Sequence, residues 1–210
     1  MYSLVKPLFV RKELLERKIR IFTKQEFIRI FNLSPYQAEY SLRQLVKEGL
    51  LTRFKKGAYL LTIDPPSEEE IANALYKPSY VSFEYALGYY SIIPEIVYTI
   101  TSATTKSTRL FTVGHNSFAY YTIKRAAYTG YTLIQREERR FYIAEPEKAL
   151  VDYLYVISLG KRALLGDKSV NDRLELKSLD KEKILIFARL YNWPKLDRLI
   201  KEVLWSRKNS

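Results

Sequence analysis

The sequence predicts an α+β protein of two domains, a small helical domain followed by a larger one that contains a sheet. Two helix-start signals, at residues 23–26 and 34–37, are followed closely by a short basic hairpin. After an acidic, proline-containing stretch at 64–70, several segments alternate between apolar and polar residues, as strands with one buried face do. We therefore expect domains at residues 1–63 and 64–210.

Residues 1–20 are expected to form the first helix of the first domain. Leu8, Leu14, Leu15 and Ile19 would cover the domain core, while the basic residues Arg11, Lys12, Arg17, Lys18 and Arg20 stay in water. The same helix is the candidate for a homodimer contact.

Two capping boxes predict the next two helices. Residues 23–26 read Thr-Lys-Gln-Glu, and residues 34–37 read Ser-Pro-Tyr-Gln. In each box the side chain of the first residue accepts a hydrogen bond from the backbone N–H of the fourth. The side chain of the fourth residue accepts one from the backbone N–H of the first. The second helix is expected to run to about Glu48. Its apolar stripe, which we expect to be buried, consists of Ala38, Leu42, Leu45 and Val46.

A basic hairpin follows these helices. Residues 50–54 and 58–61 are predicted strands, and Lys55-Lys56-Gly57 is the tight turn between them. Helices separated by a short turn and followed by a hairpin describe a winged helix-turn-helix, in which the second helix enters the major groove of DNA. The predicted fold is therefore a winged helix-turn-helix, then an α+β domain with a mostly antiparallel sheet and C-terminal helices.

The exposed face of the helix after Ser34 carries hydrogen-bonding, aromatic and cationic groups, the chemistry that reads base edges. The candidate base contacts are Tyr36, Gln37, Tyr40 and Arg43, with Ser34 and Gln44 beside them. The candidate phosphate contacts are Lys47, Arg53, Lys55 and Lys56. The alternative is a protein-interaction module whose basic face is only solvated.

Charge supports a polyanion as partner. The formal net charge is +12. Residues 1–62 hold 13 Lys/Arg and 5 Asp/Glu, whereas residues 63–210 hold 22 and 18. Dense positive charge on a small domain suits double-stranded DNA, because Lys and Arg that contact phosphates release condensed counterions.

Composition excludes several kinds of site. The chain has no cysteine, so it has no disulfide, thiolate metal site or cysteine nucleophile. Its one histidine, His115, excludes multi-histidine metal sites. A phosphate-binding loop and a dinucleotide glycine fingerprint are also absent. The first fifteen residues lack a signal-peptide layout. We expect a cytoplasmic protein that is not an enzyme and uses no cofactor or metal.

The second domain is predicted to alternate helices and strands. Helices are expected at 68–76, 84–90, 146–159, 181–190 and 194–205. Strands are expected at 96–102, 109–113, 117–123, 131–136 and 140–143. A turn at 137–139 and a polar loop near 166–178 complete the domain.

Three features of the second domain have competing interpretations. Residues 145–148 resemble the acidic-acidic-lysine core of restriction-type nucleases, but a helix start with acids at its positive end explains them better. The segment after residue 101 is either a Ser/Thr-rich loop or a contact surface for a toxin or nucleic acid through Lys106, Thr108 and Arg109. The many tyrosines of the second domain fit core positions with a solvent-exposed hydroxyl better than they fit platforms for stacking.

Several spaced motifs resemble the AbiEi-like antitoxins, which are predicted transcriptional regulators of viral defence. These motifs are SYVSFEYALGYYSIIPEIVYTITSATTKSTRLF, NSFAYYTIK, TGY and RRFYIAEPEKALVDYLY. The resemblance covers about residues 20–158 and is weaker beyond. It implies repression of the protein's own operon through inverted repeats in the promoter, and action against a nucleotidyltransferase-like toxin. The alternative is a stand-alone transcription factor whose second domain dimerises or senses a ligand.

Overall fold

A computed structural model of the chain describes residues 5–136, 139–160 and 169–205. The chain divides into two compact units. The first comprises Met1–Leu75 with Glu137–Arg139, and the second comprises Tyr76–Arg136 with Arg140–Ser210. Helices and strands occur in both, and most strand pairs are antiparallel, so the α+β class is confirmed.

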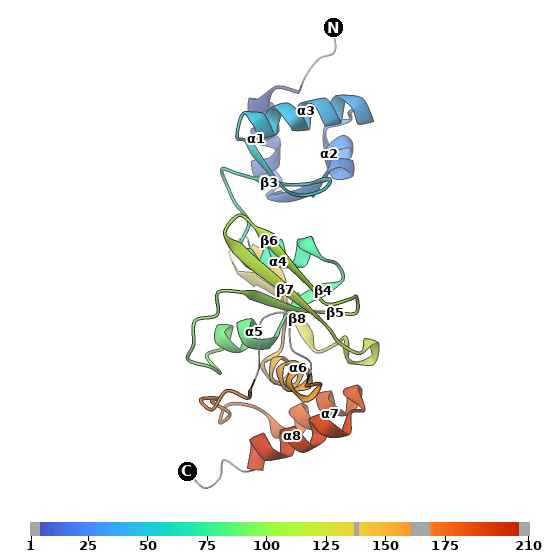
Figure 1. Cartoon of the computed structure of the whole chain (residues 1–210). Coiled ribbons are helices and arrows are strands. Elements are labelled where there is room, and N and C mark those ends of the chain that lie inside the picture. Colours follow the sequence, from blue (N-terminus) through green and yellow to red (C-terminus); the bar gives the residue numbers. More distant parts are fainter. Residues whose placement is uncertain (1–4, 137–138, 161–168, 206–210) are drawn as a thin grey trace. The chain divides into compact units, whose positions relative to one another are not determined.

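Four helices and three strands make up the described part of the first unit (Figure 1). In chain order they are α1 (Pro7–Glu16), β1 (Ile21–Thr23), α2 (Lys24–Phe31), α3 (Pro35–Lys47), β2 (Leu51–Lys55), β3 (Ala58–Leu61) and α4 (Glu68–Leu75). Both capping boxes form as predicted, Thr23 with Glu26 and Ser34 with Gln37. The strands form an antiparallel sheet of order β1-β3-β2.

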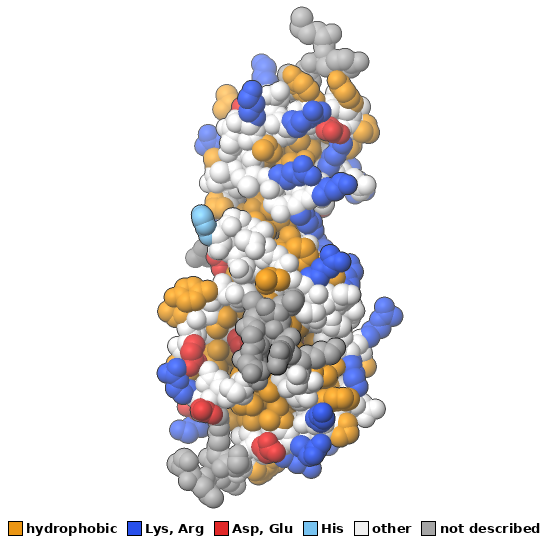
Figure 2. Space-filling view, in the orientation of Figure 1, with side chains coloured by type: hydrophobic (Ala, Val, Ile, Leu, Met, Phe, Trp, Pro, Cys, Tyr) orange, Lys and Arg blue, Asp and Glu red, His pale blue; other side chains and the backbone are white. Residues whose placement is uncertain are grey.

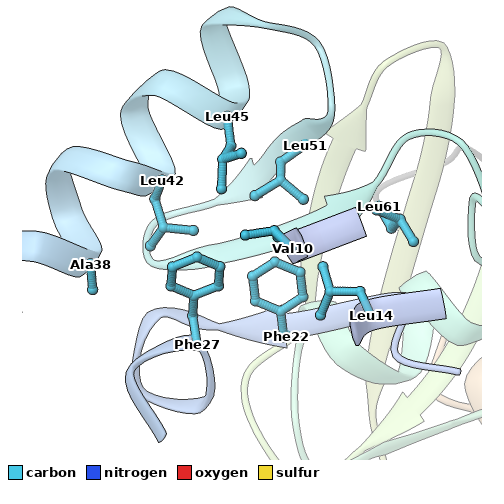
Figure 3. Close-up of a cluster of buried hydrophobic side chains, with 9 residues drawn as sticks. All are labelled: Val10, Leu14, Phe22, Phe27, Ala38, Leu42, Leu45, Leu51 and Leu61. Atoms are coloured by element: carbon cyan, nitrogen blue, oxygen red, sulfur yellow. The ribbon is translucent and has the colours of Figure 1, made fainter. Parts of the chain in front are cut away.

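The apolar core of the first unit lies between α1, α2, α3 and this sheet (Figure 3). Its buried members are Val10, Leu14, Phe22, Phe27, Ala38, Leu42, Leu45, Leu51 and Leu61. Three side chains expected in the core, Leu8, Leu15 and Val46, are exposed, and Arg20, expected in water, is buried in an ion pair with Asp64. The Leu8 side chain is 77% exposed, since Val10 and Leu14 take the inward positions of α1. Val46 is 36% exposed because it lies past the edge of the α3 stripe that Leu42 and Leu45 form.

A six-stranded sheet forms the framework of the second unit, in the order β6-β7-β5-β4-β9-β8. Its strands are β4 (Ser79–Val81), β5 (Ile100–Thr104), β6 (Arg109–Val113), β7 (Asn116–Thr122), β8 (Tyr131–Arg136) and β9 (Arg139–Ala144). The sheet is mixed, because β5 pairs with β7 and β4 pairs with β9 in parallel. The strand expected at 96–102 is displaced, since regular pairing begins only at Ile100.

Helices cover one side of this sheet in Figure 1. They are α5 (Phe83–Tyr89), α6 (Pro146–Ser158), α7 (Lys181–Tyr191) and α8 (Pro194–Trp205), and a short 3-10 turn η1 spans Arg125–Ala127. The α6 helix is the most buried of them and packs against α5, α7 and α8. Within the described residues, no helix combines the length and the apolar character that a membrane crossing needs. Of the predicted turn and loop, residues 137–138 and 166–168 lie outside the described residues.

Candidate nucleic-acid interface

The start of α3 is fixed by its own side chains. Ser34 Oγ accepts a bond from the backbone N–H of Gln37 at 3.3 Å, and Gln37 Oε1 accepts from the N–H of Ser34 at 2.9 Å. Pro35 occupies the first helical position, where a missing N–H costs nothing. Because its oxygen serves the cap, Gln37 has its NH₂ group left to offer a ligand.

The solvent face of α3 brings the predicted base-contact residues together. Tyr36 is 69% exposed and Tyr40 is 41% exposed, so a large part of both aromatic side chains faces solvent. The Arg43 side chain is 71% exposed, one turn beyond Tyr40 on the same face. Buried Ala38, Leu42 and Leu45 hold the opposite face against the core.

One acidic side chain accompanies this face, and it is neutralised locally. Lys24 Nζ, from the first turn of α2, donates to Glu39 Oε2 at 2.7 Å. Arg43 lies 3.8 Å from the other carboxylate oxygen. Lys24 first, and Arg43 to a lesser degree, hold the pKa of the Glu39 carboxyl below its usual value. Glu39 therefore orients two cations, a role that local sequence analysis missed because Lys24 is fifteen residues away.

The β2–β3 hairpin separates the two lysines of its turn. Lys56 is exposed, and Gly57 takes the left-handed backbone conformation that the turn requires. Lys55 instead donates to the carbonyls of Ala74 at 2.6 Å and Leu75 at 3.1 Å. These carbonyls end α4, where the helix dipole favours a cation. The hairpin thus offers Lys56 and the exposed Arg53 outward, while Lys55 caps a helix.

Cationic side chains outnumber acidic ones on the visible face of the first unit. Figure 2 shows Lys and Arg spread over the part that carries α1, α2 and α3 in Figure 1, with few acidic groups among them. The exposed Lys47 in the last turn of α3 adds to this positive field. Gln44, beside it, is half-buried.

Comparison with known families places this surface in context. Residues 12–62 match the AbiEi_4 family model, "Transcriptional regulator, AbiEi antitoxin". The match covers the second half of α1, then β1, α2, α3 and the hairpin, and it confirms the AbiEi resemblance over this segment. The motifs quoted from the second domain lie outside it. No curated protein matches the chain.

A second cluster of predicted residues lies at one end of the sheet in the second unit. Lys106 Nζ lies 5.4 Å from the centre of the Tyr76 ring, and Arg109 Cζ lies 5.9 Å from it. Thr108 is used internally, since its hydroxyl bonds to that of Thr122 at 3.0 Å and accepts from the Thr122 N–H. Both exposed cations therefore lie over the same tyrosine ring.

Glu145, Glu147 and Lys148, the residues that resemble a nuclease core, do not gather at one site. Glu145 and Glu147 both pair with Lys183 of α7. Lys148 points to different partners, Asp152 and Tyr191, in the buried interior. Among the described residues, no cluster of three or more His, Asp or Glu side chains is arranged to hold a metal ion.

Proposed function

We propose that the chain is a DNA-binding transcriptional autorepressor whose first unit is a winged helix-turn-helix. The observation that carries the proposal is the exposed face of α3, where Tyr36, Tyr40 and Arg43 stand clear of a fully packed core. The order α1-β1-α2-α3-β2-β3 and the three-stranded antiparallel sheet support it. In this assignment α3 lies in the major groove and the hairpin lies along a phosphate backbone.

The contacts divide by chemistry. Tyr36, Gln37, Tyr40 and Arg43 would face base edges, with Ser34 and Gln44 at the margin of that contact. Lys47, Arg53 and Lys56 would face phosphates, which position the protein without reading sequence. Lys55 would hold the β2–β3 hairpin to the end of α4, because its amine is already bonded there. It would still add its positive charge to the potential that attracts DNA.

Footprinting on the DNA upstream of the protein's own gene tests the proposal directly. We expect protection of an inverted repeat by the wild type. A Tyr40→Ala/Arg43→Ala variant with an unchanged circular dichroism spectrum should give no protection. Arg198→Ala, which removes an exposed cation from α8 of the second unit, is the matched control and should protect normally. Equal protection by all three proteins would remove α3 from the interface.

We propose further that the second unit opposes a nucleotidyltransferase-like toxin, as the AbiEi resemblance implies. Lys106 and Arg109 supply a candidate surface, because the Tyr76 ring holds both outward. Co-expression with a nucleotidyltransferase-like toxin tests this. Lys106→Ala/Arg109→Ala should lose neutralisation while keeping promoter repression. If the double variant still neutralises, this surface is not the functional one.

A ligand-responsive regulator is the second candidate function. The observation that favours it is a surface depression of about 670 Å³ in the second unit, formed by α5, the segment after it and residues 173–175. Tyr85, Tyr89 and Ile92 line it beside the Glu95–Arg173 ion pair. Repression that responds to a small molecule in cells without the toxin gene would favour this alternative.

A further inference from the structure

Positive charge is unevenly distributed along the second part of the chain. Residues 96–136 hold five Lys/Arg and no Asp or Glu. The remainder of residues 63–210 holds 17 Lys/Arg and 18 Asp/Glu, so it is close to neutral. The acid-free stretch contains β5, β6, β7 and β8. A surface that carries charge of one sign attracts ligands of the opposite sign.

The sheet brings four of these five cations to one end. β5 and β7 run parallel, and their last residues, Thr104 and Thr122, pair with each other. The segments that follow these two residues therefore lie at the same end of the sheet, and they carry Lys106, Arg109, Lys124 and Arg125. Lys124 donates to a backbone carbonyl at the end of α7, whereas the other three are exposed.

The turn between β5 and β6, residues 105–108, is held in place by hydroxyl groups. Thr122 donates to the carbonyl of Lys106 at 2.7 Å, and Tyr76 donates to the carbonyl of Ser107 at 3.2 Å. The Lys106 N–H donates to the hydroxyl of Thr104 at 3.2 Å. In the part of the chain that the structure describes, the hydroxyl and the N–H of Ser107 have no protein partner. The turn therefore offers a ligand hydrogen-bond donors that are already ordered.

The two cations of the turn lack a counterion. Among the described residues, no carboxylate pairs with Lys106 or Arg109. Both lie over the Tyr76 ring, so two like charges are kept close together. An anion bound between them would interact favourably with both. Arg and Lys next to a free hydroxyl are the donors that phosphate groups accept from.

The side chains around the turn resemble a surface for nucleic acid more than one for protein. Residues 104–109 and 122–126 expose no large hydrophobic side chain. Protein interfaces have an apolar centre depleted of charge, whereas DNA interfaces are polar and positively charged. Leu110, the exposed apolar residue that follows Arg109, points to the opposite face of β6.

We propose that the β5–β6 turn binds the sugar–phosphate backbone of a nucleic acid, with Lys106, Arg109 and the Ser107 hydroxyl on phosphate oxygens. The proposal rests on the role proposed above for Lys106 and Arg109 as a partner surface, and it names the chemistry that this surface recognises. Contacts to phosphates carry no sequence information, so the binding is independent of base sequence. Reading of the operator stays with α3.

The salt dependence of binding tests the proposal on the full chain. Fluorescence anisotropy is measured with two probes of equal length that lack the operator, a DNA duplex and a single-stranded RNA. Lys106→Ala/Arg109→Ala should reduce the slope of log affinity against log salt by about two on the duplex or about 1.4 on the single strand. The probe that shows the reduction identifies the form of nucleic acid.

A matched variant controls for the loss of net charge. Lys195→Ala/Arg198→Ala removes two exposed cations from α8 of the same unit and should keep the wild-type slope on both probes. Lys106→Arg/Arg109→Lys keeps both charges and should also keep the slope. Equal slopes for the two alanine variants on both probes would overturn the proposal. So would a Lys106→Ala/Arg109→Ala protein that binds both probes like the wild type but no longer neutralises the toxin, because the surface would then contact protein.

Amide NMR locates the contact and separates it from α3. In the full-length Tyr40→Ala/Arg43→Ala protein, the probe should shift the amide signals of Ser107 and Thr108. Shifts confined to the first unit would contradict the proposal. Failure of the wild type to protect an operator would remove the α3 assignment, and it would leave the slopes and shifts of the β5–β6 turn unaffected.

Discussion

Lys148 donates a hydrogen bond to Asp152 one turn later in α6, and both side chains are fully buried. The same carboxylate accepts bonds from the hydroxyls of Tyr80 at 2.9 Å, Ser82 at 2.8 Å and Tyr191. One buried anion therefore joins β4, the start of α5, α6 and α7. Such a charge is tolerated only when all its partners are present.

Asp152→Asn should destabilise the second unit. The substitution keeps the shape but removes the negative charge, so Lys148 is left without a counterion in a buried site. Breaking a buried pair by removing one partner costs about 3 kcal/mol or more in the free energy of unfolding. Trp193 and Trp205 are the chain's two tryptophans, and both belong to the second unit. Urea unfolding followed by tryptophan fluorescence measures the loss in this unit.

The double variant Lys148→Met/Asp152→Asn is the control for that result. It removes both charges and leaves hydrogen-bonding groups for Tyr80 and Ser82. We expect it to recover part of the lost stability. A double variant as unstable as Lys148→Met and Asp152→Asn combined additively would show that the ion pair carries no coupling.

Buried tyrosines predict a loss of stability in alkaline solution. Burial raises the pKa of Tyr80 and Tyr191 well above the usual value, and it raises the pKa of Tyr90 and Tyr128 to about 12. Above pH 10 the unfolded chain releases tyrosine protons that the folded chain keeps, so folding stability falls as pH rises. Burial lowers the pKa of Lys148, which acts in the opposite direction, but it is one group against six tyrosines, since burial also raises the pKa of Tyr120 and Tyr155.

Urea unfolding at pH values from about 9 to 12 measures this slope. The stability of the second unit should fall increasingly above pH 10. Tyr90→Phe removes one of the titrating hydroxyls and should make the slope shallower. A stability that stays level or rises up to pH 12 would contradict the prediction.

Most helices could be predicted from the sequence, because the residues that start a helix lie within one turn of each other. The capping boxes at Thr23 and Ser34 start their helices where expected, and α3 ends one residue before the predicted Glu48. The three-residue strands β1 and β4 escaped prediction. β4 exists because it pairs with β5 and, through Val81 and Ile143, with β9. Three residues are too few to show the alternation that predicts a strand, and the pairing partners lie far away in the sequence.

The candidate site shows the same limit. Helical geometry predicts a common face for Tyr36, Tyr40 and Arg43, and the structure exposes all three. The use of Lys55 by the end of α4 depends on a contact nineteen residues along the chain, so a basic turn alone does not reveal it. Lys148 and Asp152 have the spacing of a helical ion pair, but their burial follows from packing by other elements.

Arg43→Ala should weaken binding to the operator more than binding to unrelated DNA. A side chain that reads a base edge contributes about 1–3 kcal/mol of discrimination. Arg43 can leave Glu39 for a base because Lys24 still neutralises that carboxylate. Fluorescence anisotropy with operator and scrambled duplexes measures both affinities. Equal losses on the two duplexes would make Arg43 a phosphate contact.

The two lysines of the β2–β3 hairpin, Lys55 and Lys56, should contribute differently to the salt dependence of DNA binding. Lys56→Ala should lower affinity for every sequence and reduce the slope of log affinity against log salt by about one. Lys55→Ala should change the salt slope less, because its amine is bonded to the carbonyls of Ala74 and Leu75. Anisotropy titrations at several salt concentrations separate the two. Identical slopes for both variants would show that Lys55 leaves α4 to reach DNA.

Gly130→Ala should be among the most damaging single substitutions in the second unit. Gly130 has a φ of +72°, and a Cβ there would lie 2.5 Å from Phe187 Cε1 and 3.1 Å from Lys148 Cγ. The left-handed backbone costs about 1–2 kcal/mol for alanine, and overpacking adds about 1–3 kcal/mol. Gly114→Ala has a similar φ of +61° but open space around it, so it should lose only the backbone part. Adding Phe187→Leu should restore stability to Gly130→Ala and not to Gly114→Ala. Equal losses for the two alanine variants would mean that Phe187 moves aside without cost.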